Sequence, residues 1–329
     1  MALPKLHILD VGHGNCCVLE DLKGVIIFDA GPGGTLLKFL DESKIKAIDE
    51  ILLSHADTDH VYGLVNLLLD KKIRVKRIYL NPDASKRTGA WQDLRIALAD
   101  ARNRLGNKTE VVVELTTNDS LKISRGAVKI EIVAPTPELA LGGSGGIDLK
   151  GRTLTSNSLS VVVRLNINGR PLALLPGDID SVGLENLLEN HKALKSKTLL
   201  FPHHGGLSRS KDPVSFTEEL CKLVSPELVV FSIGRGKHAT PSPEVIGTVR
   251  RISSKVHIAC TQLSEQCADS LPSIKPKHLS KFAARGKTNN SCCAGTITIE
   301  FGKKERISPK LADHKEFVQS NAPRAVCNR

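Results

Sequence analysis

The chain has 329 residues, which is enough for one large domain or two smaller ones with a sizeable core. Its formal charge of +11 suits a polyanionic partner, although many basic proteins have none. Aromatic residues make up only 3% of the chain, which argues against nucleic-acid binding by base stacking. We find no signal-peptide pattern and no run of the ~18 apolar residues that a membrane span needs. With eight cysteines, this predicts a cytoplasmic protein with reduced thiols and no membrane partner.

Apolar periodicity predicts strands and helices that alternate along the first half of the chain. Strands are expected at 5–11, 16–20, 24–29, 48–53, 75–82, 109–116 and 128–135, and helices at 35–44, 61–72 and 88–106. The segment 136–151, which is rich in glycine, is expected to be a loop.

The second half continues the alternation. It predicts a hairpin over 159–180 with its turn at "NING", strands in 197–206, 227–234, 256–262 and 295–302, and helices over 182–194 and 241–252. The basic segment 268–290 has few structural signals, and the polar residues 304–329 are expected to form a loosely ordered tail. Because many strands fall in hairpins, a purely parallel sheet does not fit. We therefore expect an α/β fold of two mixed β-sheets covered by helices.

Four polar clusters follow directly after apolar strands. They are Asp29, the hexapeptide "HADTDH" at 55–60, Asp178, and the pair His203 and His204. Strand ends are where layered α/β proteins assemble their sites. Carboxylates and imidazoles without a nearby thiolate suit Zn²⁺ or Mn²⁺. Two such ions about 3.5–4 Å apart hold a bridging hydroxide and clamp a phosphodiester in known two-metal sites.

These clusters resemble the motifs of the metallo-β-lactamase fold. "HADTDH" is similar to its His-x-[His/Asp]-x-Asp-His signature. The blocks "LHILDVGHGNCCVLE", "IIFDAGPG", "TSNSLSVVVRL", "LLPGDI", "LLFPHHGG" and "GRGKHATPSPEVI" resemble, in order, those of a subfamily, the hydrolase domain of the DNA-uptake protein ComEC. The resemblance covers about residues 5–300. It implies an αββα sandwich, here a hydrolase domain over residues 1–303 followed by the tail.

The resemblance also implies a metal centre with two ions per chain. One ion would be bound by His55 and Asp57, and the other by Asp59, His60 and His203. Asp178 would bridge both ions. Asp29 would orient a ligand histidine from behind.

Two departures from the family pattern weaken the first metal position. Asp57 replaces a histidine found in many lactamase-like enzymes, and the block that often supplies another histidine reads "SNS" around Asn157. The first position is therefore expected to prefer Mn²⁺, or to bind its ion weakly and only together with substrate. Asn157 and its neighbour Ser158 either cap a strand end or contact the metal-bound water.

Three further histidines have open roles. His204 either contacts substrate or is a packed ring. His238 resembles a residue that donates a proton to a leaving oxygen or contacts phosphate, and otherwise is an exposed loop histidine. His13 lies in a loop that reaches the site in this family, but a plain turn residue is an equal alternative.

The final third of the chain offers cysteines and a basic stretch. A structural Zn²⁺ site is one reading of these cysteines, and small buried hydrophobic residues are the other; they are Cys260, Cys267, Cys292 and Cys293. A cationic flap over a nucleic-acid backbone is one reading of the basic residues, and an ordinary solvated loop is the other; they are Lys275, Lys277, Lys281, Arg285 and Lys287.

The sequence thus predicts a metal-dependent hydrolase, foremost a phosphodiesterase or nuclease acting on DNA or nucleotides, with Asp59, His204 and His238 in the catalytic apparatus. The alternatives are hydrolysis of a small ester, lactone or thioester, which does not need the basic stretch, and a metal-organised sensor or adaptor with little turnover. A protein partner is compatible with either, but no residue identifies one.

Overall fold

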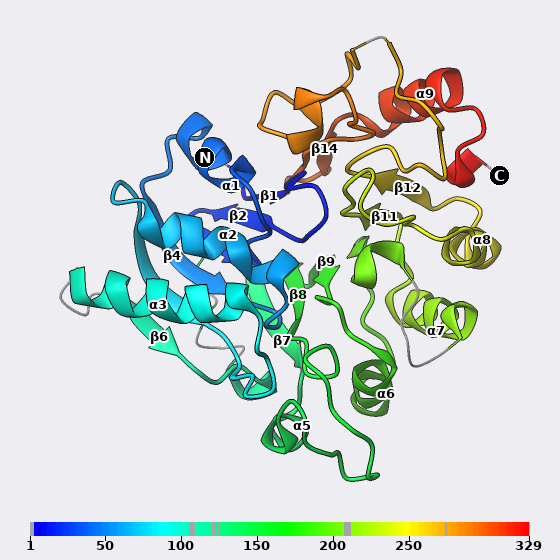
Figure 1. Cartoon of the computed structure of the whole chain (residues 1–329). Coiled ribbons are helices and arrows are strands. Elements are labelled where there is room, and N and C mark those ends of the chain that lie inside the picture. Colours follow the sequence, from blue (N-terminus) through cyan, green and yellow to red (C-terminus); the bar gives the residue numbers. More distant parts are fainter. Residues whose placement is uncertain are drawn as a thin grey trace.

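Apolar runs form the strands of two β-sheets that pack face to face in the computed structural model (Figure 1). The structure describes residues 3–104, 109–119, 123, 126–206, 212–273 and 275–328. None of the helices in these ranges combines the length and apolar character that crossing a bilayer requires.

The first sheet has eight strands in the order β14-β13-β1-β2-β3-β4-β5-β6. Their bounds are β1 (Lys5–Ile8), β2 (Cys17–Asp21), β3 (Gly24–Phe28), β4 (Ala47–Leu52), β5 (Arg74–Tyr79), β6 (Glu110–Val112), β13 (Ile297–Glu300) and β14 (Arg306–Ser308). The pairs from β14 to β3 are antiparallel, whereas β3 to β6 run parallel.

The second sheet has six strands in the order β12-β11-β10-β9-β8-β7. Their bounds are β7 (Lys129–Ala134), β8 (Val162–Ile167), β9 (Arg170–Leu175), β10 (Thr198–Leu200), β11 (Leu228–Phe231) and β12 (His257–Cys260). The pairs β7–β8 and β8–β9 are antiparallel, and β9 to β12 are parallel. Both sheets are therefore mixed, as predicted.

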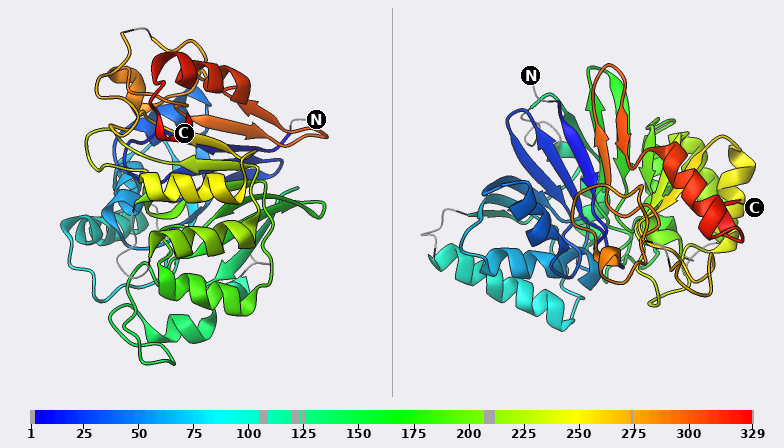
Figure 2. Two further views of the ribbon diagram at one scale, coloured as in Figure 1. Left: turned by 90° about the vertical axis from the view of Figure 1, so that its right-hand side faces the viewer. Right: turned by 90° about the horizontal axis from the view of Figure 1, so that it is seen from above.

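Helices cover the outer face of each sheet, which confirms the αββα sandwich (Figure 2). The first sheet is covered by α1 (Thr35–Glu42), α2 (Thr58–Leu69) and α3 (Gly89–Arg104). The second is covered by α6 (Ser181–Asn190), α7 (Pro213–Val224) and α8 (Pro243–Ile252). Residues such as Leu6, Ile130 and Val163 fill the layer between the sheets.

Before the C-terminal segment, two helices among the described residues add to the predicted elements. The expected loop 136–151 begins with a short helix, α5 (Pro137–Gly142), because Thr136 caps it by accepting a hydrogen bond from the Leu139 amide. Helix α7 was not predicted; Asp212 caps its start, and Pro213 fits its first turn. Helix α3 ends at Arg104, and residues 105 and 106 of the predicted helix lie outside the described residues.

The prediction of a loosely ordered C-terminal tail is wrong. Strand β14 extends the first sheet, and helix α9 (Leu311–Asn321) packs on the second. Phe317 and Val318 of α9 belong to the core against α8 and β12, and the Arg250 guanidinium donates to the carbonyl of Cys327 at 2.7 Å. The apolar positions in this segment are few, but they are buried.

We expect Phe317→Ala to lower the free energy of unfolding by about 3–5 kcal/mol, because it removes a buried aromatic ring from the core. Thermal and urea unfolding followed by circular dichroism would measure the change. Lys315→Ala, at an exposed position of the same helix, is the control and should stay within about 0.5 kcal/mol of the parent. Equal melting of Phe317→Ala and the parent would contradict the packing of α9.

Candidate metal centre

The polar clusters lie at the carboxyl ends of parallel strands from both sheets. Asp29 follows β3, and residues 54–60 span the loop after β4 and the first turn of α2. On the second sheet, Asp178 follows β9, and His203 and His204 follow β10. Parallel neighbours end at the same edge of a sheet, so each sheet delivers its polar residues to one place. The two sets meet through Asp59, whose Oδ2 lies 3.0 Å from His204 Nε2.

The carboxylate of Asp29 fixes the loop after β4. Its Oδ1 accepts a hydrogen bond from the Ser54 amide at 2.7 Å, and its Oδ2 accepts from Ser54 Oγ and His60 Nδ1, both at 2.8 Å. The His60 ring is fully buried, and its Nε2 faces Asp178 Oδ2 at 3.4 Å. A carboxylate behind a ligand histidine sets the tautomer and the direction of the free nitrogen. Asp29 thus has the geometry predicted for it.

Four side chains converge closely enough to hold one ion. Ligand atoms of Asp59, His60, Asp178 and His204 all lie within 4.8 Å of one another, and three of these residues are buried. In the described ranges this is the one such group of three or more histidine, cysteine, aspartate or glutamate residues. Two carboxylates and two imidazoles form a donor set that fits Zn²⁺ or Mn²⁺.

The sequence predicts His203 as the metal ligand of the two adjacent histidines, whereas the structure directs His204 toward the other ligand residues. His204 Nδ1 donates to the Ser232 carbonyl at 2.6 Å, which leaves Nε2 directed at Asp59. His203 Nε2 instead donates to the Ile179 carbonyl at 3.2 Å, and its Nδ1 stays 3.7 Å from Asp178 Oδ2. Both residues have left-handed backbones, with φ of 52° and 54°. His204, expected near substrate or in packing, therefore joins the ligand group, and His203 does not.

The fit to an ion is supported by the electrostatics of the group. Burial alone would raise the pKa of Asp59, but the hydrogen bond from His204 and the charge of His60 lower it well below its usual range. Burial likewise opposes a charged His60, yet Asp178 and Asp29 raise the pKa of its ring well above the ordinary value. The carboxylates of Asp59, Asp178 and Asp29 therefore concentrate negative charge around the two rings, and a divalent cation could replace the proton that they favour on His60.

His55 and Asp57 form a second, smaller group beside the first. His55 Nε2 is buried, has no hydrogen-bond partner among the described residues, and lies 3.7 Å from Asp57 Oδ2. Asp57 precedes α2 but its side chain does not cap the helix. Its carboxylate pairs instead with the Lys86 ammonium group, a residue that the sequence did not single out because it lies in a polar loop without a motif.

His13 and His238 lie on the other side of the four-residue group. The His13 ring centroid is 4.1 Å from that of His204 and 4.4 Å from that of His238, and His13 Nε2 is 3.5 Å from Asp59 Oδ2. Burial, with the neighbouring His204, lowers the pKa of His13 to about 3. His238 is exposed. His13 thus belongs to the surroundings of the site and is more than a plain turn residue.

Asn157 lies in a turn close to the loop after β4. The Val161 amide, a few residues later, donates to the Ser54 carbonyl at 2.9 Å. Ser158 Oγ donates to Asp180 Oδ2 at 2.7 Å, so Ser158 holds its own turn. The Asn157 Oδ1 atom is buried and has no hydrogen-bond partner in the part of the chain that is described.

The four cysteines do not form a ligand set. Cys292 Sγ faces Asp10 Oδ2 at 3.6 Å, whereas Cys293 Sγ lies 3.2 Å from His314 Nε2. No three ligand atoms that include the thiols of Cys260 and Cys267 come within 4.8 Å of one another in the described chain. All four side chains are buried. The structural-zinc reading is therefore not supported, and packing explains the cysteines.

The basic residues of 275–287 separate into different environments. Lys287 Nζ donates to the carbonyls of Ser280 and Phe282 at 2.7 and 2.6 Å, so its ammonium group ties its own loop together. Lys281 is exposed, with Nζ 5.4 Å from the Phe282 ring centroid. Arg285 is exposed beside the 12–14 loop, where its Nη1 donates to the Val11 carbonyl at 3.3 Å.

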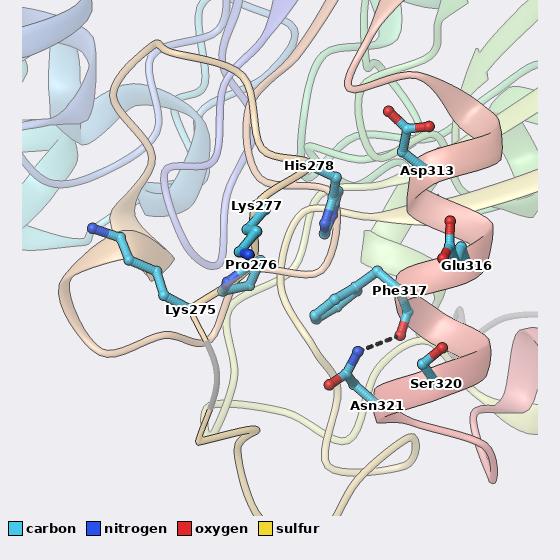
Figure 3. Close-up of a pocket in the computed structure, with 9 residues that line it drawn as sticks. All are labelled: Lys275, Pro276, Lys277, His278, Asp313, Glu316, Phe317, Ser320 and Asn321. Atoms are coloured by element: carbon cyan, nitrogen blue, oxygen red, sulfur yellow. Dashed lines mark hydrogen bonds between the residues drawn. The ribbon is translucent and has the colours of Figure 1, made fainter.

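Lys275 and Lys277 line a cavity of about 380 Å³ next to α9 (Figure 3). Figure 3 shows that Lys275 points away from α9, while Asp313 and Glu316 of that helix line the same cavity. The mixed charge does not favour a phosphate backbone here. Of the predicted basic set, Arg285 is the residue that the structure places beside the His13 loop.

Comparisons with known proteins agree on the fold. The model of the Metallo-beta-lactamase superfamily matches residues 9–203. ComE operon protein 3 of Bacillus subtilis (strain 168) is 23% identical over 275 residues, which are 77% of this chain and 31% of that protein. The chain therefore spans about a third of the length of this curated relative.

Solved structures give weaker similarities. Igni18, a metallo hydrolase from Ignicoccus hospitalis KIN4/I, has a TM-score of 0.47 at 14% identity and covers 91% of this chain and 100% of its own. The metallo-beta-lactamase fold protein YhfI from Bacillus subtilis has a TM-score of 0.45 at 11% identity and covers 78% and 95%. Neither is similar enough to indicate what this chain acts on.

We expect Asp29→Asn to weaken binding of Zn²⁺ or Mn²⁺ by about 10–100-fold, because an amide cannot accept from Ser54 and His60 as the carboxylate does. Competition with a chromogenic chelator would measure the affinity. Asp41→Asn, at a carboxylate that is 85% exposed, is the control and should bind as the parent does. Unchanged affinity in Asp29→Asn would show that Asp29 does not orient a ligand.

The two adjacent histidines allow a matched test. We expect His204→Asn to weaken ion binding by at least about 100-fold, and His203→Asn by no more than about 10-fold, since only His204 directs a nitrogen into the four-residue group. Calorimetric titration of the chelator-treated proteins would give both affinities. The opposite order would restore His203 as the ligand.

Proposed function

Since the chain belongs to the metallo-beta-lactamase superfamily, we propose that this metal-dependent hydrolase cleaves phosphodiester bonds in DNA or nucleotides. The observation that carries the proposal is the mostly buried group of two carboxylates and two imidazoles, with cationic side chains in the adjoining loops. Lys86 pairs with Asp57 on one side, and Arg285 lies along the His13 loop on the other. Positive side chains around such a centre suit an anionic substrate better than a neutral ester.

A divalent ion in this group would lower the pKa of water and polarise a phosphoryl oxygen. The chain's own residues supply the rest. Asp59 and Asp178 place negative charge at the ion, while Asp29 and the Ser232 carbonyl hold the rings of His60 and His204 in direction. Buried, hydrogen-bonded side chains of this kind do not need to reorganise when substrate binds.

Protonation of the leaving oxygen is assigned to the exposed side of the site. We assign it to His238, because its ring lies 4.4 Å from the His13 ring and is exposed to a bound substrate. Arg285 would hold a neighbouring phosphate through charge, without choosing a base sequence. Sequence-independent binding also fits a chain with few aromatic residues.

The proposal includes Zn²⁺ or Mn²⁺ as the bound metal and the cytoplasm as the compartment. Zn²⁺ and Mn²⁺ both match the donor set of the four-residue group. The eight cysteines are free thiols, which fits a reducing compartment such as the cytoplasm.

We expect protein reloaded with Mn²⁺ or Zn²⁺ to hydrolyse at least one phosphodiester among single- and double-stranded DNA, RNA, cyclic nucleotides and bis(p-nitrophenyl) phosphate. Chelator should abolish turnover. Asp59→Ala should lower kcat/KM by at least about 100-fold, because it removes a ligand of the centre. Asp41→Asn is the control and should retain full activity.

Two results would overturn the proposal. Phosphodiester turnover that persists in Asp59→Ala would come from a contaminating nuclease. Turnover of thioesters or lactones alone would make this chain a small-ester hydrolase.

A further inference from the structure

The His55–Asp57 side of the centre contains an ammonium group. Lys86 forms an ion pair with Asp57, whose other oxygen lies 3.7 Å from His55 Nε2. The side chain of Lys86 is 21% exposed and that of His55 is 1% exposed. The lysine is therefore partly open to solvent and ends at the carboxylate that faces His55 Nε2, an atom with no hydrogen-bond partner within the described ranges.

The loop that carries Lys86 is fastened to the site. Asp83 Oδ1 accepts hydrogen bonds from the amides of Ser85 and Lys86, both at 3.0 Å, and from Ser85 Oγ at 2.7 Å. The other carboxylate oxygen of Asp83 accepts from Ser156 Oγ, in the turn that holds Asn157. Asp83 is buried. A buried carboxylate with four donors is a rigid anchor, so the position of Lys86 is built into the fold.

The His55–Asp57 side of the centre has too few ligands to bind a second ion tightly. His55 and Asp57 supply two donor atoms, and in the described chain no third histidine, cysteine, aspartate or glutamate atom lies within 4.8 Å of both. Zinc sites in proteins have at least three protein ligands. A divalent ion placed here would also be repelled by the lysine, which already balances the charge of Asp57.

We propose that the ammonium group of Lys86 takes the place of a second ion, so that the chain binds a single divalent ion at Asp59, His60, Asp178 and His204. This rests on the metal centre of the proposed function and changes the number of ions expected from the family resemblance. Lys86 supplies a fixed positive charge where a second ion would otherwise face a substrate oxygen. The reaction then depends on one ion and one lysine, with Asp57 positioning that lysine.

The number of bound ions tests the proposal without any activity assay. Chelator-treated protein would be titrated with Mn²⁺ by calorimetry and, after desalting, analysed by elemental mass spectrometry. We expect one tightly bound ion per chain in the parent and in Lys86→Arg, and in Lys86→Ala a second, more weakly bound ion at saturating Mn²⁺, because the charge of Asp57 is no longer neutralised. The Mn²⁺ electron paramagnetic resonance spectrum should be that of an isolated ion in the parent and should show coupling between two ions in Lys86→Ala.

A second lysine–aspartate pair provides the control. Lys76 pairs with Asp49 between β5 and β4, and Lys76→Ala should still bind one ion. Thermal unfolding of the metal-free variants would verify that each is folded. Two ions in the parent, or one ion in a folded Lys86→Ala, would overturn the role of Lys86 and leave the proposed function standing. A parent that binds no ion would contradict the metal centre itself.

Discussion

The hydrogen bonds accepted by Asp29 are the constraint on which the rest of the centre depends. Strands β3 and β4 are parallel neighbours with Phe28 opposite Leu52, so the residue after β3 lies directly beside the loop after β4. Asp29 uses that position to hold the backbone and hydroxyl of Ser54 and the ring of His60. Because these groups are buried, each unmade bond would cost about 1–3 kcal/mol, and the loop has one stable arrangement.

The fold was predictable because its signals are local and repeated. Apolar strands, glycine turns and helix starts recur through residues 5–302, and each matches an element of the sandwich. The C-terminal segment was not predictable in the same way. Its few apolar residues, such as Phe317, are buried only because they pack in one core with α8 and β12, which lie far away in sequence. Local propensity does not include these distant contacts, so the sequence alone predicts a polar tail.

The sequence predicted that polar residues at the strand ends form the site, but it did not predict which individual side chains contact one another. Polar residues after parallel strands had to meet, and the structure brings Asp59, His60 and Asp178 together. Which of two adjacent histidines joins them depends on backbone angles that no residue pattern encodes. Lys86 depends on a loop anchored through Asp83 and Ser156, a contact between segments distant in sequence. Pairwise contacts of this kind become visible only in three dimensions.

The left-handed backbone of His203 and His204 restricts how such a centre can evolve. A non-glycine residue in this conformation costs about 1–3 kcal/mol, and here two occur in succession. Two chemically identical rings thereby differ in direction: the Nε2 atom of His203 faces the Ile179 carbonyl, and that of His204 faces Asp59. Swapping their duties would require the peptide between them to refold. New specificities in this scaffold should therefore arise by exchanging surrounding side chains, while the paired imidazoles keep their assigned directions.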